Sequence, residues 1–96
     1  MQPDPRKVAR ALDALSAAKL LALRVQPFLR ACLLALRPVP APGPWGPDIP
    51  GTLAVDYGGR MFFDPDFVLL QAPGALAAGL LHECWHILHQ HNVRYP

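Results

Sequence analysis

The amino-acid sequence predicts a small α+β fold, with helices at both ends of the chain and a β-hairpin between them. Three observations predict it: a helical pattern of apolar residues before Val25, two short β-rich runs on either side of Gly58, and a proline-free helical stretch after Gly74. A chain of 96 residues is long enough for one hydrophobic core and too short for two. We therefore expect residues 1–96 to form a single domain.

The first helix is predicted over residues 5–25, where apolar side chains recur at helical spacing and charged side chains lie opposite. Asp4 precedes Pro5 in the order that favours a helix start, an N-cap followed by a proline in the first turn. A second, shorter helical pattern covers residues 28–37. We expect residues 1–37 to form a helical cover on the core.

Proline accounts for 12 of the 96 residues, and six of the twelve lie between Pro38 and Pro50. Its usual share is about 5%. Because proline donates no backbone hydrogen bond, such a run is a poor partner for a helix or a sheet. We therefore expect residues 38–51 to be a loop that follows the surface in an extended or polyproline conformation.

A β-hairpin is predicted in the middle of the chain. Thr52–Asp56 and Arg60–Asp64 are β-rich runs, and they are joined by Tyr57-Gly58-Gly59, whose glycines accept positive φ. A brief helix is expected from Pro65 to about Leu70, because Asp64 is a suitable N-cap.

The final helix is predicted from Ala75 to about His91, so residues 52–96 hold the hairpin and this helix. Its first two turns are apolar all round, and a helix of that kind is usually buried. We expect Leu76–Leu81 to be buried on most sides, at the centre of the core.

The charges are distributed unevenly within a net charge of +2. Residues 1–37 carry seven Lys or Arg and two Asp, whereas residues 38–96 carry two Arg and five acidic residues. No aromatic residues interleave with the basic ones, so we expect no nucleic-acid binding. The apolar stretches are too interrupted for a signal peptide and shorter than the roughly 20 residues of a membrane span. We expect a cytoplasmic protein in which Cys32 and Cys84 stay reduced as small buried groups.

His82-Glu83-Cys84-Trp85-His86 matches the pattern H-E-x-x-H and falls within the predicted final helix, the context in which this pattern binds metal. Glu83 is the only glutamate, and all four histidines lie within residues 82–91. Side chains four residues apart share one helix face, so His82 and His86 are predicted ligands of Zn²⁺.

Glu83 is rotated by about 100° from His82 around the helix. That is too far for a third ligand but near enough to reach a water molecule on the metal. A carboxylate in this position acts as a general base, since zinc lowers the pKa of its bound water towards about 7. The pattern predicts hydrolysis of peptide bonds by a metal-activated water.

The sequence leaves the third ligand open, although a catalytic zinc site uses three protein ligands and one open position. His89 shares a face with His86 and would approach the metal from the same side. His91 reaches the metal if the helix ends near His89. A residue beyond Pro96 or a water molecule is a further alternative. The remaining candidates are carboxylates for which turn or capping roles give a sufficient explanation: Asp56, Asp64 and Asp66.

Four segments follow one another in an order typical of a known family. They are the loop Arg37–Gly43, the run Gly51–Asp56, the step Phe63-Asp64-Pro65, and the helix Leu80–His86 with His91 five residues later. These segments resemble the bacterial metallopeptidase domain that is found ahead of von Willebrand factor A-like domains. The resemblance covers roughly residues 25–96.

The resemblance implies a zincin-like α+β fold with His82, Glu83 and His86 as site residues, and it matches His91 to a recurrent histidine of the family. It also implies Zn²⁺ as the cofactor and a von Willebrand factor A-like domain as a partner. In that family the chain continues into a further helix with acidic residues. A domain that stops at Pro96 would therefore be truncated at its C-terminus, and His91 or a partner would have to complete the metal site.

The leading hypothesis is a zinc-dependent peptidase that acts on a peptide or protein, with the strand Arg60–Asp64 lying along the cleft and pairing with an extended substrate. The alternative is a non-catalytic, truncated zincin that acts as an interaction or regulatory module through its basic first helix and the loop around Trp45. A third hypothesis is a structural zinc site or a metal-free, hydrogen-bonded core cluster.

Overall fold

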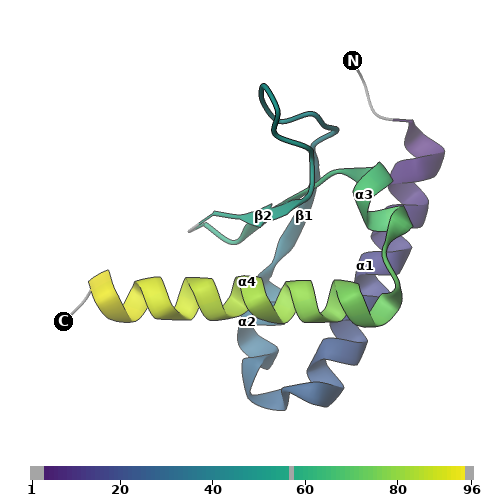
Figure 1. Ribbon diagram of the computed structural model, residues 1–96. Coiled ribbons are helices and arrows are strands. Elements are labelled where there is room, and N and C mark those ends of the chain that lie inside the picture. Colours follow the sequence, from purple (N-terminus) through teal and green to yellow (C-terminus); the bar gives the residue numbers. More distant parts are fainter. Residues whose placement is uncertain (1–3, 57, 95–96) are drawn as a thin grey trace.

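The computed structural model describes residues 4–56 and 58–94, with side chains described as far as His89. It has four α-helices, one short 3₁₀ helix and three strands in these ranges, which confirms a small α+β fold (Figure 1). The elements are α1 (Pro5–Val25), η1 (Pro27–Leu29), α2 (Arg30–Ala35), β1 (Arg37–Pro40), β2 (Leu53–Val55), β3 (Arg60–Phe63), α3 (Pro65–Leu70) and α4 (Pro73–Arg94).

Helix α1 has the bounds that the sequence predicts. The side chain of Asp4 accepts a hydrogen bond from the backbone amide of Arg6 at 2.9 Å, and Pro5 occupies the first turn. One face of the helix is buried because its small and aliphatic residues recur at helical spacing. The buried residues are Ala11, Leu15, Ala18 and Ala22.

The second helical segment is shorter than the predicted 28–37. It begins as the 3₁₀ helix η1, continues as α2, and ends at Ala35, after which Leu36 is extended with φ −66° and ψ 125°. Proline disfavours helical conformation in the residue before it, so Pro38 prevents Arg37 from continuing the helix. Arg37 belongs to β1, and the helical cover ends before it.

The prediction that the proline-rich segment joins no sheet is wrong for its first residues. Strand β1 pairs with β3 in parallel. The amides of Arg37 and Ala41 donate to the carbonyls of Gly59 and Phe63, each at 2.8 Å. In such a ladder only alternate residues donate to the neighbouring strand, so prolines at positions 38 and 40 fall on the outer edge, where no amide is needed.

The predicted hairpin is confirmed, and it supplies the other two strands. Strand β3 lies in the middle of the sheet, in the order β1-β3-β2, and pairs with β2 in antiparallel fashion. Gly59 has a φ of 83°, as the turn requires, and Asp56 accepts hydrogen bonds from the amides of Gly58 and Arg60. Tyr57, also predicted in this turn, lies outside the described residues.

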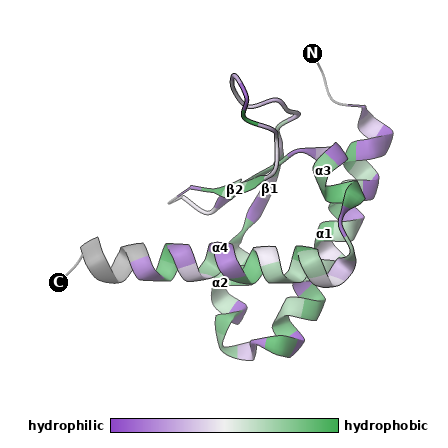
Figure 2. Cartoon of the chain, in the orientation of Figure 1, coloured by the Kyte–Doolittle hydropathy of each residue, from purple (hydrophilic) through white to green (hydrophobic). Residues whose placement is uncertain are grey.

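The core lies between the sheet and the helices. Met61 and Phe63 of β3 are fully buried. Helix α4 crosses beneath the sheet (Figure 1). Figure 2 shows hydrophobic residues along α1, α2 and the first half of α4, and α4 packs on both other helices. The helices before and after the hairpin therefore form one continuous core with it.

Helix α4 is less buried than the sequence predicts. Leu76, Ala77 and Leu80 are buried, but Ala75 and Ala78 are exposed. Among the described elements, α1 and α2 cover one side of α4 and β2 approaches another, which leaves the remaining side in solvent. No helix among the described residues is long and apolar enough to cross a membrane.

Lys19 interrupts the apolar face of α1 and has a structural role there. Its Nζ atom donates to the carbonyl of Leu36, just after α2, at 2.9 Å. Partial burial lowers the pKa of this amine. The ammonium group therefore ties α1 to the carboxyl end of α2, where helix carbonyls lack partners.

We predict that Lys19→Ala lowers the free energy of unfolding by about 1 kcal/mol, because a partly buried carbonyl loses a charged donor. Urea unfolding followed by circular dichroism measures this change. Lys7→Ala is the matched control, since Lys7 pairs with Asp66 at 3.0 Å on the exposed surface and such pairs contribute little. Equal losses in the two variants would contradict the assignment.

Candidate functional site

His82 and His86 lie one turn apart on α4, and their side chains converge. Their Nε2 atoms are 2.9 Å apart, and the two ring planes are inclined at 87°. Two imidazoles bound to one tetrahedral zinc at about 2.0–2.1 Å would have their nitrogens roughly 3.3 Å apart. If the two nitrogens moved apart by a few tenths of an ångström, both would lie at ligand distance from one ion.

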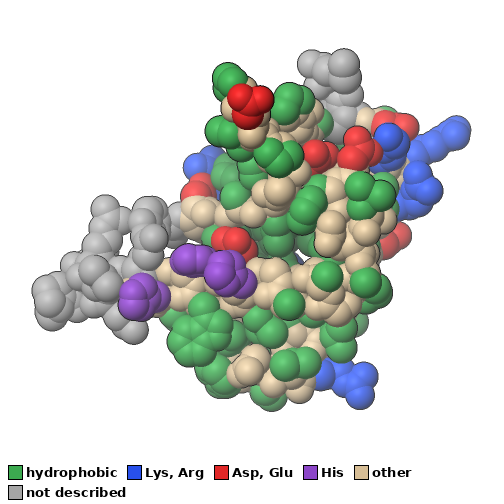
Figure 3. Space-filling model, viewed as in Figure 1, with side chains coloured by type: hydrophobic (Ala, Val, Ile, Leu, Met, Phe, Trp, Pro, Cys, Tyr) green, Lys and Arg blue, Asp and Glu red, His purple; other side chains and the backbone are tan. Residues whose placement is uncertain are grey.

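The histidine pair is open to solvent. Both side chains are exposed, and they line a cavity of about 250 Å³ together with Trp85 and His89. Figure 3 shows the described histidines in a row along the surface of α4. The site thus has access for an ion, for water and for a larger ligand.

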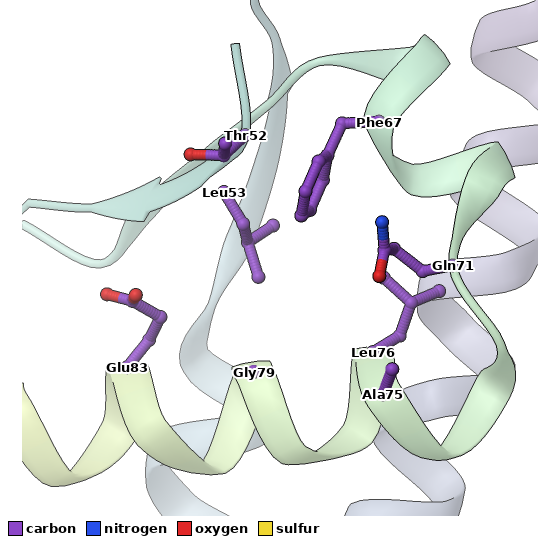
Figure 4. Close-up of a pocket in the computed structure, with 8 residues that line it drawn as sticks. All are labelled: Thr52, Leu53, Phe67, Gln71, Ala75, Leu76, Gly79 and Glu83. Atoms are coloured by element: carbon purple, nitrogen blue, oxygen red, sulfur yellow. The ribbon is translucent and has the colours of Figure 1, made fainter. Parts of the chain in front are cut away.

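Glu83 is directed toward the sheet. Its side chain is half-buried and is directed from α4 toward β2 (Figure 4). There it lines a second cavity, of about 180 Å³, with Thr52 and Leu53. The carboxylate therefore lies between the helix that carries the histidines and the nearest strand, which is a suitable position for a group that exchanges protons with a bound substrate.

Two of the three upstream aspartates, Asp56 and Asp64, have the turn and capping roles that the sequence suggested, whereas Asp66 forms a surface ion pair. Asp56 pairs with Arg60 at 2.6 Å, and hydrogen bonds from the backbone and side chain of Arg60 lower the pKa of its carboxyl group. Asp64 caps α3 by accepting from the amide of Asp66 at 3.1 Å. Asp66 in turn pairs with Lys7.

No third ligand joins the pair among the described side chains, which contain no group of three His, Cys, Asp or Glu residues close enough to hold a metal. Cys84 lies between the two histidines in the sequence but is buried. Burial, followed by a hydrogen bond with Cys32, raises the pKa of its thiol to about 12. Since a metal binds the thiolate, Cys84 acts as a neutral core residue, as predicted. Cys32, expected to be buried as well, is only half-buried.

The comparison with family models decides the family. Residues 11–96 match the model described as "Putative metallopeptidase domain". The chain belongs to this metallopeptidase family. Membership supports a metallopeptidase function in general and implies a metal. A comparison with curated proteins found no match. A comparison with solved structures found none either.

The structure of this metallopeptidase domain gives little information on His91 as a metal ligand. The arrangement that would let it reach the metal requires the helix to end near His89, but α4 continues through Arg94. The side chain of His91 lies outside the described side chains. Its role as a ligand stays a prediction.

The structure corrects the predicted position of the substrate strand. Arg60–Asp64 was expected to pair with a substrate, but β3 is the middle strand and both of its edges are already paired. Sequence analysis also missed the cavity next to Glu83. Its one sequence signal is Gly79, a glycine in the interior of the final helix, four residues before Glu83.

We predict that His82→Ala and His86→Ala each weaken zinc binding by more than about tenfold, because each removes one of the converging nitrogens. The measurement is zinc per chain by mass spectrometry after loading and desalting. Trp85→Phe is the control, since Trp85 lines the same cavity but its indole nitrogen is a donor only and cannot bind zinc. Full zinc content in either of the first two variants, or none in the wild type, would contradict the site.

Proposed function

We propose that this domain is a zinc-dependent peptidase in which His82 and His86 hold the metal and Glu83 is the general base. The observation that carries the proposal is the pair of exposed Nε2 atoms 2.9 Å apart, with the carboxylate of the next residue directed toward β2 (Figure 4). Imidazole nitrogens suit zinc well. Membership of the metallopeptidase family supports the same reading.

A bound zinc ion supplies a Lewis acid, which makes water more acidic and polarises the carbonyl of a peptide bond. The remaining chemistry falls to Glu83. Its carboxylate accepts the proton of the attacking water and later delivers that proton to the leaving nitrogen. This reaction needs an acid–base group beside the ligands but not among them, and the place of Glu83 next to His82 in the sequence of α4 supports that role.

For the third ligand we propose His91, which the family resemblance matches to a recurrent histidine. A residue beyond Pro96 or a partner chain is the alternative, because α4 continues through Arg94. The zinc assay described above separates the two. If His91 is a ligand, His91→Ala weakens zinc binding as strongly as His82→Ala does.

The two edges of the sheet differ in their ability to bind a peptide. The outer edge of β1 carries Pro38 and Pro40, which have no amide to donate. On the hairpin, the Asp64 amide donates to the Thr52 carbonyl at 2.9 Å, and the Asp56 amide donates to the Arg60 carbonyl at 3.0 Å. In an antiparallel ladder, residues that hydrogen-bond to the neighbouring strand alternate with residues whose backbone groups point away from it. The residues of β2 between these two pairs follow the same alternation.

It follows that Leu53 and Val55 direct their amides and carbonyls outward from the edge of β2. Among the described residues, no other backbone group pairs with them. Extended peptides add to an edge of this kind through main-chain hydrogen bonds. Because Leu53 and Glu83 line one cavity, a peptide on β2 would lie next to the proposed general base. We therefore propose β2 as the strand that binds the substrate.

Three further parts of the peptidase hypothesis are also proposals, and they rest on the sequence and the family resemblance. They are a peptide or protein as substrate, a von Willebrand factor A-like domain as partner, and a cytoplasmic location. The alternative of a non-catalytic interaction module is not favoured, since the family match is to a metallopeptidase domain.

We predict that Glu83→Gln keeps zinc but lowers kcat for peptide hydrolysis by about 10²-fold or more, because the amide cannot accept the proton. Hydrolysis of a fluorescently labelled, unfolded casein and zinc content are measured on the same sample. Unchanged hydrolysis in Glu83→Gln would contradict the assignment of the base. A wild type that binds zinc but cleaves nothing would favour the non-catalytic module.

We predict that Val55→Pro raises KM for peptide hydrolysis severalfold while the protein stays folded, because it removes an outward amide and no ladder hydrogen bond. Val55→Ala is the matched control: it shortens the side chain but keeps the amide. Circular dichroism checks the fold of both variants. If KM changes equally in the two variants, the backbone of β2 does not bind the substrate.

A further inference from the structure

The cavity beside Glu83 is lined by three parts of the fold and is partly open to solvent (Figure 4). Thr52 and Leu53 of the β2 segment form its upper wall, and Phe67 and Gln71 close the end next to α3. Helix α4 forms the floor, with Glu83 at the opposite end. Apart from Glu83, the lining contains no charged side chain. The other lining residues on α4 are Ala75, Leu76 and Gly79.

Gly79 contributes no side chain to the floor of this space. A Cβ atom added at Gly79 would meet Leu53 Cδ2 at 3.7 Å, an ordinary contact distance. The position lies within a regular helix and has no positive φ. A glycine inside a helix costs about 1 kcal/mol relative to alanine. Neither backbone conformation nor packing requires this glycine, and a side chain longer than alanine at this position would extend into the cavity.

We propose that this cavity binds the side chain of a substrate residue next to the scissile bond, with a preference for leucine, methionine or phenylalanine. The inference rests on the proposed function, and it names the class of substrate. In an extended peptide alternate side chains point to the same face, so a peptide added to β2 directs every second side chain toward α4. The cavity lies on that face and reaches Glu83.

The size and chemistry of the cavity set the preference. A dry cavity of about 150 Å³ lined by aliphatic and aromatic groups accommodates benzene, so a space of about 180 Å³ accommodates a leucine or phenylalanine side chain. The carboxylate of Glu83 disfavours an acidic side chain, because like charges repel. Apolar burial favours leucine over alanine at this position by about tenfold or more.

The first experiment is cleavage of a randomised peptide library by the zinc-loaded protein, with the cut sites read by mass spectrometry. The expected result is enrichment of leucine, methionine and phenylalanine at one position next to the scissile bond. Cleavage without any such enrichment would overturn the inference while leaving the proposed function intact.

Gly79→Leu tests the cavity itself, because the new side chain fills it from the floor. We expect kcat/KM for the best leucine-containing peptide to fall at least tenfold relative to its alanine counterpart. Ala78→Leu is the matched control: it adds the same side chain at an exposed neighbouring position that does not line the cavity. An unchanged leucine-to-alanine ratio in Gly79→Leu would also overturn the inference.

Thermal melts establish whether the variants fold. If Gly79→Leu does not fold, Phe67→Ala takes its place, because it widens the cavity and should shift the preference toward tryptophan. An unaltered preference in a folded Phe67→Ala protein counts against the inference.

A binding measurement separates this inference from the proposed chemistry. The probe is a fluorescein-labelled hexapeptide of alternating threonine and valine with one central leucine, and its alanine counterpart. Fluorescence anisotropy is measured with metal-free protein, in which no cleavage occurs. Binding of the leucine peptide about tenfold more tightly, with the difference lost in Gly79→Leu, supports the cavity even if the wild type cleaves nothing. Equal binding of the two peptides would refute it.

Discussion

The packing of α4 through a single buried face is the constraint on which the candidate site depends. Leu76, Leu80 and Cys84 are held against α1, α2 and the sheet, and this fixes the rotation of the helix about its axis. At about 100° per residue, Glu83 then falls at the edge of the buried stripe, while His82 and His86 fall beyond it in solvent. The proposed division of roles between general base and ligands therefore follows from where the helix is buried.

Two further features of the sequence, the prolines of β1 and Gly79, shape the region next to that helix. Prolines at alternate positions of β1 close one edge of the sheet, and the ordinary amides of β2 leave the other edge open on the side of α4. Gly79 adds no side chain to the space between this edge and the helix. An edge for a peptide backbone, a cavity for one side chain, and a carboxylate thus lie within one small region of the molecule (Figure 4).

Much of the fold could be predicted from local signals. The bounds of α1 follow from its cap and its periodicity, and the hairpin follows from its β-rich runs and its glycines. The parallel pairing of β1 could not be predicted in this way, because it joins residues more than twenty positions apart. The number of prolines also misled the prediction, because prolines at alternate positions of an edge strand leave its pairing amides in place.

The candidate site was predictable to a similar extent. The spacing of His82, Glu83 and His86 on a helix is a local property, and the helix forms where it was expected. The exposure of Ala75 and Ala78 was not foreseen, since it depends on how few elements are available to cover α4. A third ligand depends on tertiary contacts, and no local pattern supplies those.

The most direct test of the metal site is X-ray absorption spectroscopy of the zinc-loaded protein, which identifies the atoms bound to the metal. The account predicts at least two imidazole nitrogens at about 2.0–2.1 Å and no sulfur. A sulfur ligand at about 2.3 Å, or a metal without histidine ligands, would contradict it.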